Sequence, residues 1–122
     1  PLGSGPNPLL NLYYPTKGSF IALVGQLREF AAIRKLKIGF MEVSDFPIIS
    51  INAPFTIPGI DFSDHLNYWA KNWPAVMVTD TAFLRNPNYH TAEDTPDTLD
   101  YKKMSEVIKG VAGMLLNFAE QQ

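Results

Sequence analysis

The chain contains no cysteine, so disulfide bonds and thiolate zinc sites are excluded. Histidine is also scarce: besides twelve carboxylates, only His65 and His90 could bind a metal through side chains of the usual kinds. The net charge of −2 gives no basic surface for nucleic acid. No apolar run approaches the roughly 20 residues that a membrane-spanning helix needs. We therefore expect neither nucleic acid nor a membrane as a partner.

The composition is that of an ordinary globular protein, with 46% apolar, 18% charged and 12% aromatic residues in a chain of 122. This length fits one domain. The first six residues, PLGSGP, resemble the remnant left by a tag-cleaving protease, and we interpret residues 1–6 as vector-derived. Residues 7–122 are then expected to form a single α/β domain.

Apolar runs bounded by glycine or proline alternate with segments rich in helix-forming residues. The runs at 19–25, 48–52 and 74–80 predict strands, and residues 26–41, 63–71 and 100–120 predict helices. Such alternation favours a sheet covered by helices. We expect a small three-layer α/β sandwich whose mostly parallel sheet has three or four strands.

The last helix has the clearest amphipathic pattern. Its large apolar residues recur at the three- and four-residue intervals of a single helical face. The sequence therefore predicts a buried stripe made of Met104, Val107, Ile108, Val111, Leu115 and Phe118.

Three segments carry polar residues in a distinctive order: GIDFSDH at 59–65, PAVMVTDTA at 74–82 and RNPNYHTAEDTPDTLDY at 85–101. In this order and spacing they resemble the C-terminal part of the co-catalytic zinc aminopeptidases, the clan of metallopeptidases that also includes the glutaminyl cyclases. The resemblance covers residues 13–118. It implies a partial aminopeptidase fold, and a peptide N-terminus as substrate if the family's activity persists.

The resemblance implies that His90, in the Tyr-His-Thr segment, occupies a zinc-ligand position. A neutral imidazole on a loop beyond a strand is a suitable ligand, and Asp94 or Asp97 could orient the ring or the loop. The alternative is that the aspartates and threonines of this segment only cap turns and the start of the last helix.

The Ser-Asp-His segment offers a second candidate. In the related enzymes it borders the active site, and the resemblance gives Asp64 a supporting role in the catalytic hydrogen-bond network. A different interpretation places Asp64 at a helix start, where its charge is favourable. For His65 we expect a structural role.

The remaining ligands of a complete enzyme of this type, and its general-base glutamate, lie in an N-terminal half to which nothing in this chain corresponds. Because a catalytic zinc needs three protein ligands, zinc is expected to bind weakly or not at all. Three hypotheses follow: an aminopeptidase-like protein that is inactive alone, a peptidase with a residual or interface-built zinc site, and a non-catalytic binding or scaffolding module.

The missing half also leads to an expectation about assembly. Without it, a strand edge and apolar surface would be uncovered, which favours a homo-oligomer. The aromatic side chains of Tyr13, Tyr14 and Phe20 are candidate contacts. In the alternative, residues 7–18 fold back over the edge of a monomer.

Overall fold

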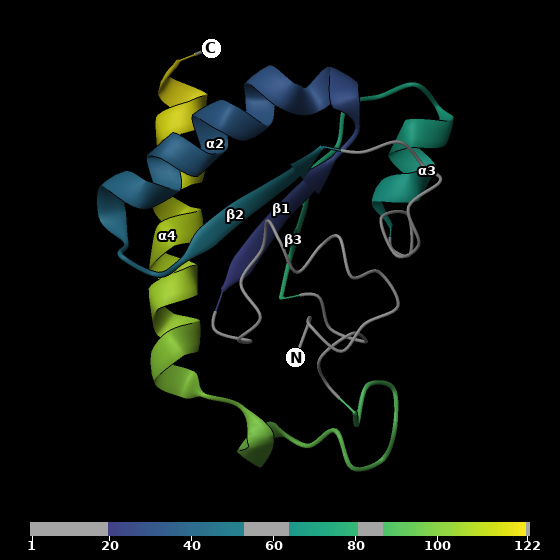
Figure 1. Cartoon of the computed structure of the whole chain (residues 1–122), viewed down its shortest axis with the longest axis vertical. Coiled ribbons are helices and arrows are strands. Elements are labelled where there is room, and N and C mark those ends of the chain that lie inside the picture. The colour runs from purple at the N-terminus through teal and green to yellow at the C-terminus, as the bar shows by residue number, and fades with distance from the viewer. Residues whose placement is uncertain (1–19, 53–63, 81–86, 122) are drawn as a thin grey trace, which may run out of the picture.

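The computed structural model describes residues 20–52, 64–80 and 87–121 (Figure 1). The expected tag remnant at 1–6 and the loop at 7–18 lie outside these residues. The elements are β1 (Ile21–Gly25), the 3-10 turn η2 (Leu27–Glu29), α2 (Phe30–Val43), β2 (Ile48–Asn52), α3 (His65–Ala70), β3 (Met77–Thr79), the 3-10 turn η4 (Pro96–Thr98) and α4 (Tyr101–Glu120).

The described strands form one sheet in the order β2-β1-β3. β1 and β2 run parallel, with Ile21 opposite Ile48, and α2 makes the crossover between them. β3 runs antiparallel to β1, with Leu23 opposite Val78. The predicted α/β class is confirmed, and the sheet is mixed because β3 enters from the opposite end.

β1 is the central strand, and all five of its residues are buried. Because side chains alternate along a strand, Ala22 and Val24 point to one face while Leu23 points to the other. Ala22 and Val24 pack with Phe20 and with Trp69 from α3. Each face of the sheet therefore has its own apolar core, as a three-layer arrangement requires.

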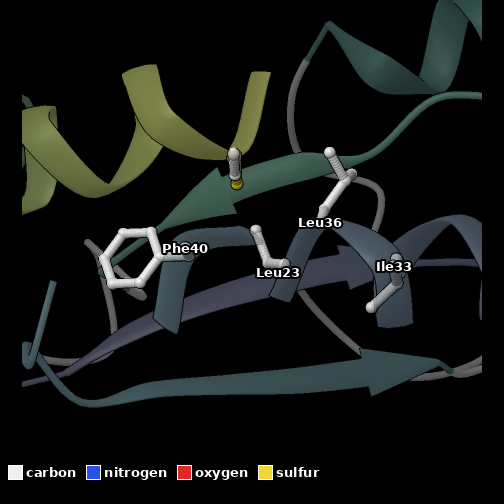
Figure 2. Close-up of a cluster of buried hydrophobic side chains, with 5 residues drawn as sticks. Leu23, Ile33, Leu36 and Phe40 are labelled. Carbon is white, nitrogen blue, oxygen red and sulfur yellow. The ribbon is translucent and has the colours of Figure 1, made fainter. Parts of the chain in front are cut away.

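The second core lies between the sheet and the helix pair α2 and α4. Figure 2 shows Leu23 of β1 together with Ile33, Leu36 and Phe40 of α2, and Met114 of α4 completes the cluster. The residues from α2 follow the spacing of one helical face. Burying each such side chain stabilises the fold by about 1.5–3 kcal/mol.

Close approach of the two helices depends on glycine. A Cβ atom at Gly110 of α4 would lie 2.2 Å from Cε2 of Phe40, whose side chain is fully buried. On the facing helix, a Cβ at Gly39 would lie 3.1 Å from the Cα of Met114. The Phe40 ring thus occupies the space that a side chain at position 110 would need.

Because Gly110 faces Phe40, the buried face of α4 differs from the one predicted from the sequence. Gly110 and Met114 are buried, whereas Ile108 is 62% exposed and Leu115 is 55% exposed. The predicted stripe was therefore wrong for these two residues and for Met104, which is also exposed. Only three of its members are partly buried in the structure: Val107, Val111 and Phe118.

The predicted helices and strands are present with adjusted boundaries. β2 spans the predicted residues, whereas β1, α3 and β3 are shorter than expected, and the first residues of the predicted helix 26–41 form η2. Phe20, one of the candidate intermolecular contacts, is only 1% exposed and packs in the core. Tyr13 and Tyr14 lie outside the described residues. No helix in the described segments has the length and apolar character needed to cross a membrane.

We predict that Gly110→Ala destabilises the protein by about 1 kcal/mol or more, because overpacking against Phe40 outweighs the gain of about 1 kcal/mol in helix propensity. Gly113→Ala is the matched control. Its Cβ would lie 2.3 Å from Cγ2 of Val43, but that side chain is 38% exposed at the end of α2 and has room to move outward, unlike the fully buried Phe40 ring. Urea unfolding followed by circular dichroism measures both. A Gly110→Ala variant as stable as Gly113→Ala would contradict the packing argument.

Candidate functional site

The segment that carries His90 is a compact turn beyond β3. The backbone N–H of Thr91 donates to the carbonyl oxygen of Asn88 at 2.9 Å, and the Thr91 hydroxyl donates to the same oxygen at 2.6 Å. Four residues are thereby closed into a turn with His90 at its third position. The His90 side chain is exposed, so its imidazole is accessible from solvent.

His90 adopts a left-handed backbone conformation, with φ of 59°. A turn with positive φ at this position favours glycine or asparagine, because a Cβ atom is strained there. The ring stacks on Tyr89, with centroids 3.9 Å apart and planes 16° apart. Strained residues cluster at functional sites, so this conformation makes His90 a candidate functional residue on structural grounds as well.

The polar residues after His90 mainly organise the chain. Asp97 accepts a hydrogen bond from the Thr95 hydroxyl, and the Thr98 hydroxyl donates to the Thr95 carbonyl oxygen at 2.7 Å. Asp100 caps α4 by accepting from the backbone N–H of Lys103 at 3.0 Å. Asp97 and Asp100 therefore stabilise a turn and the start of α4, as in the alternative in which these residues only cap local structure. Glu93 and Asp94 lie in the intervening turn.

Asp64 and His65 lie at the start of α3. Asp64 is exposed, and its backbone carbonyl accepts from Asn67 at 3.1 Å, while its side chain makes no capping hydrogen bond. His65 is 6% exposed and meets Trp69 edge-on, with ring centroids 4.5 Å apart. The Trp69 indole donates to the carbonyl oxygen of Ala75 at 3.0 Å. His65 therefore packs as part of the buried α3 face.

The structure does not bring these candidates together. Asp64 directly precedes α3 and His90 lies in the turn before η4; in Figure 1, α3 lies at the upper right and the chain that leads into η4 lies at the bottom. Within the three described ranges, no three metal-binding side chains cluster closely enough to hold an ion. The described residues alone do not fit a catalytic zinc ion, which needs three protein ligands.

A polar cluster beyond the end of β1 was not predicted. Arg28 donates to the side chain of Asn72 and, at 2.9 Å, to the carbonyl oxygen of Trp73. Its Nε also donates to Glu29 at 3.0 Å. Glu29 is 3% exposed, and its Oε2 atom has no hydrogen-bond partner among the described residues. The sequence signal was faint: a charged pair that begins three residues after a strand-ending glycine.

Comparison with known proteins gives partial similarity. The chain is 48% identical to the uncharacterized protein YfbL of Escherichia coli over 112 residues, which is 92% of this chain and 35% of that protein. It is 33% identical to probable leucine aminopeptidases of Arthroderma otae and Arthroderma benhamiae, over 64% and 61% of this chain. No protein-family model and no solved structure matches.

The chain therefore spans about a third of the length of YfbL and less than a quarter of the two aminopeptidases, whose matched shares are 23% and 22%. At this distance the similarity supports a peptidase-like relationship. It agrees with the resemblance found in the sequence motifs, and it leaves activity and metal binding to be tested.

Because the backbone of His90 is strained, replacing this residue should not lower the stability of the fold. His90→Gly and His90→Asn should leave the free energy of unfolding unchanged or raise it by about 0.5–1 kcal/mol, because both residues tolerate positive φ. Thermal unfolding of the variants beside Thr91→Ala, which loses a hydrogen bond of the turn, checks this. Strong destabilisation by both His90 variants would mean that His90 is kept for stability.

Proposed function

We propose that this chain is a zinc-aminopeptidase-like module that has no peptidase activity on its own. Two observations carry the proposal together: the similarity to aminopeptidases, and described residues with one accessible histidine and no cluster of three metal-binding side chains. Of the two histidines, His65 is buried against Trp69, and only His90 is exposed. If the family's activity operates in a larger assembly, the substrate would be a peptide N-terminus.

His90 is the proposed metal contact. In this role its neutral imidazole would supply one nitrogen to Zn²⁺, with the other ligands contributed by further polypeptide. Asp64 keeps a proposed supporting role, since its exposed carboxylate makes no capping hydrogen bond. A zinc ion held in this way would polarise a substrate carbonyl or a water molecule.

Zinc content per chain tests this proposal. After purification without added metal, atomic emission should find far less than one zinc per chain, because one imidazole falls short of the three protein ligands that a catalytic zinc needs. His90→Ala should remove the residual binding, whereas His65→Ala serves as the control. One zinc per chain that survives dialysis against chelator would overturn the proposal.

One exposed surface, which we call the α4 strip, favours the alternative hypothesis that several copies of the chain together supply the zinc ligands. It consists of the exposed residues Tyr101, Met104, Ile108, Ala112, Leu115 and Ala119. They recur at three- and four-residue intervals and form one face of the helix. Exposed apolar faces of this kind tend to recruit another chain.

The charges beside the α4 strip favour an antiparallel pairing of two copies. Lys102 and Lys103 lie in the first turn of α4, and Glu120 lies in the last. Antiparallel pairing places the lysines of one copy beside Glu120 and the negative helix end of its partner. Parallel pairing would set lysine against lysine.

Association through the α4 strip predicts a molar mass above 13.6 kDa that rises with concentration. Ile108→Lys should return the chain to monomer, because it places a charge in the apolar contact. Asn67→Lys adds the same charge on exposed α3 and should not change the mass. Light scattering coupled to size exclusion measures all three. A mass of 13.6 kDa for the unaltered chain at high concentration would rule out the homo-oligomer.

A further inference from the structure

A second surface lies between α2 and the outer edge of β2. It is an open groove with a volume of about 230 Å³. The helix and the strand line it with Phe30, Ile33, Arg34, Lys37, Ser50 and Asn52. The helical members recur at three- and four-residue intervals, so they form one face of α2 that runs along the strand.

β2 is an edge strand of the described sheet, because it is hydrogen-bonded only to β1 there. The backbone N–H of Ile21 donates to the carbonyl oxygen of Pro47 at 2.9 Å. In a parallel pair the residues facing the partner alternate, so Ile49 and Ile51 continue this ladder. The backbone groups of Ser50 and Asn52 therefore point outward.

The same two residues of β2 line the groove and form the open edge of the strand. Ser50 and Asn52 line the groove with their side chains and turn their backbone N–H and C=O groups away from β1. The Asn52 side-chain nitrogen donates to the carbonyl oxygen of Gln26 at 2.9 Å, which leaves its amide oxygen as an acceptor. An added strand would thus meet backbone and side-chain polar groups together.

The charge of the groove is positive. Arg34 and Lys37 line it, and neither forms an ion pair with a carboxylate within the described ranges. Beside them Phe30 is 60% exposed and offers an apolar contact. Two cations and an aromatic ring along a sheet edge suit a partner that is extended, acidic and partly apolar.

We propose that this groove binds an extended acidic peptide, which adds to β2 as a further strand. Backbone hydrogen bonds to Ser50 and Asn52 would supply most of the affinity, as in other strand additions. Side chains on one face of a strand repeat about every 6.8 Å, and Arg34 and Lys37 lie about 4.5 Å apart along the helix axis. Their long side chains reach two successive carboxylates of the peptide on that face.

Cations beside an edge strand can instead serve only to prevent pairing with other strands. The two explanations differ in what they predict. A protective edge binds neither acidic nor basic peptides, whereas a recognition groove prefers the acidic one. Neither His90 nor a metal enters the proposal, so it stands or falls separately from the proposed function.

The experiment titrates the whole chain with an acetylated and amidated octapeptide of alternating valine and glutamate. Isothermal titration calorimetry gives the affinity, and NMR follows the backbone amides of Ser50 and Asn52. We expect saturable binding that weakens as salt is raised, because the charges are exposed. The double variant Arg34→Gln/Lys37→Gln should lower the affinity about five- to tenfold.

Lys35→Gln is the matched control, since Lys35 lies on the same helix, is exposed and does not line the groove. It should leave the affinity unchanged. A peptide with lysine in place of glutamate, and one N-methylated at alternate residues to block strand pairing, should both bind at least about fivefold more weakly. Equal binding of the acidic and basic peptides, an effect of Lys35→Gln equal to that of the double variant, or no binding of the acidic peptide would overturn the proposal.

Discussion

The contact between the Phe40 ring and Gly110 sets the arrangement of the helical layer. It allows α4 to approach α2 closely enough for Met114 to join the core above Leu23. A polar contact supports the same pairing, because the Asn117 side chain donates to Glu42 at 2.8 Å. The orientation of α4 then determines which of its residues reach solvent.

Both candidate interaction surfaces follow from this arrangement. Since α4 buries the face that contains Gly110, the α4 strip is left exposed on its other side. Since α2 packs on α4 along one face, its Arg34 face lies over the edge of β2. One helix pair thus accounts for an apolar surface that suits a second chain and a basic groove that suits an acidic peptide.

Much of the fold could be predicted from the sequence. Short apolar runs bounded by glycine or proline identified β1 and β2, because runs of this length and composition favour strands whether they are fully buried, as β1 is, or half-buried, as β2 is. The exposed side of α4 could not be predicted in this way. Apolar periodicity counts large side chains, and it gives no weight to Gly110, whose missing side chain creates the contact with Phe40.

The direction of β3 could not be predicted from the sequence either. A strand of three residues has the same apolar pattern in a parallel and an antiparallel pair, and the chain path from α3 decides between them. The geometry of the candidate functional site could not be predicted from the sequence for a similar reason. Motif order identified His90 and Asp64 as candidates, but sequence spacing does not show how far apart α3 and the His90 turn lie.

The positive φ of His90 and the groove beside β2 both became visible only in the three-dimensional structure. The first marks a residue that costs conformational energy where glycine or asparagine would not. The second depends on side chains of α2 and β2 that are remote in sequence. Neither feature leaves a signature in composition or in local patterning.

Our central proposal is that this aminopeptidase-like chain has no peptidase activity on its own. The most direct measurement is hydrolysis of leucine and alanine anilides by the purified chain with added zinc, with and without chelator. The account predicts rates equal to the background, because metal activation of water and general-base help each contribute orders of magnitude in rate. Chelator-sensitive hydrolysis that disappears in His90→Ala would contradict it.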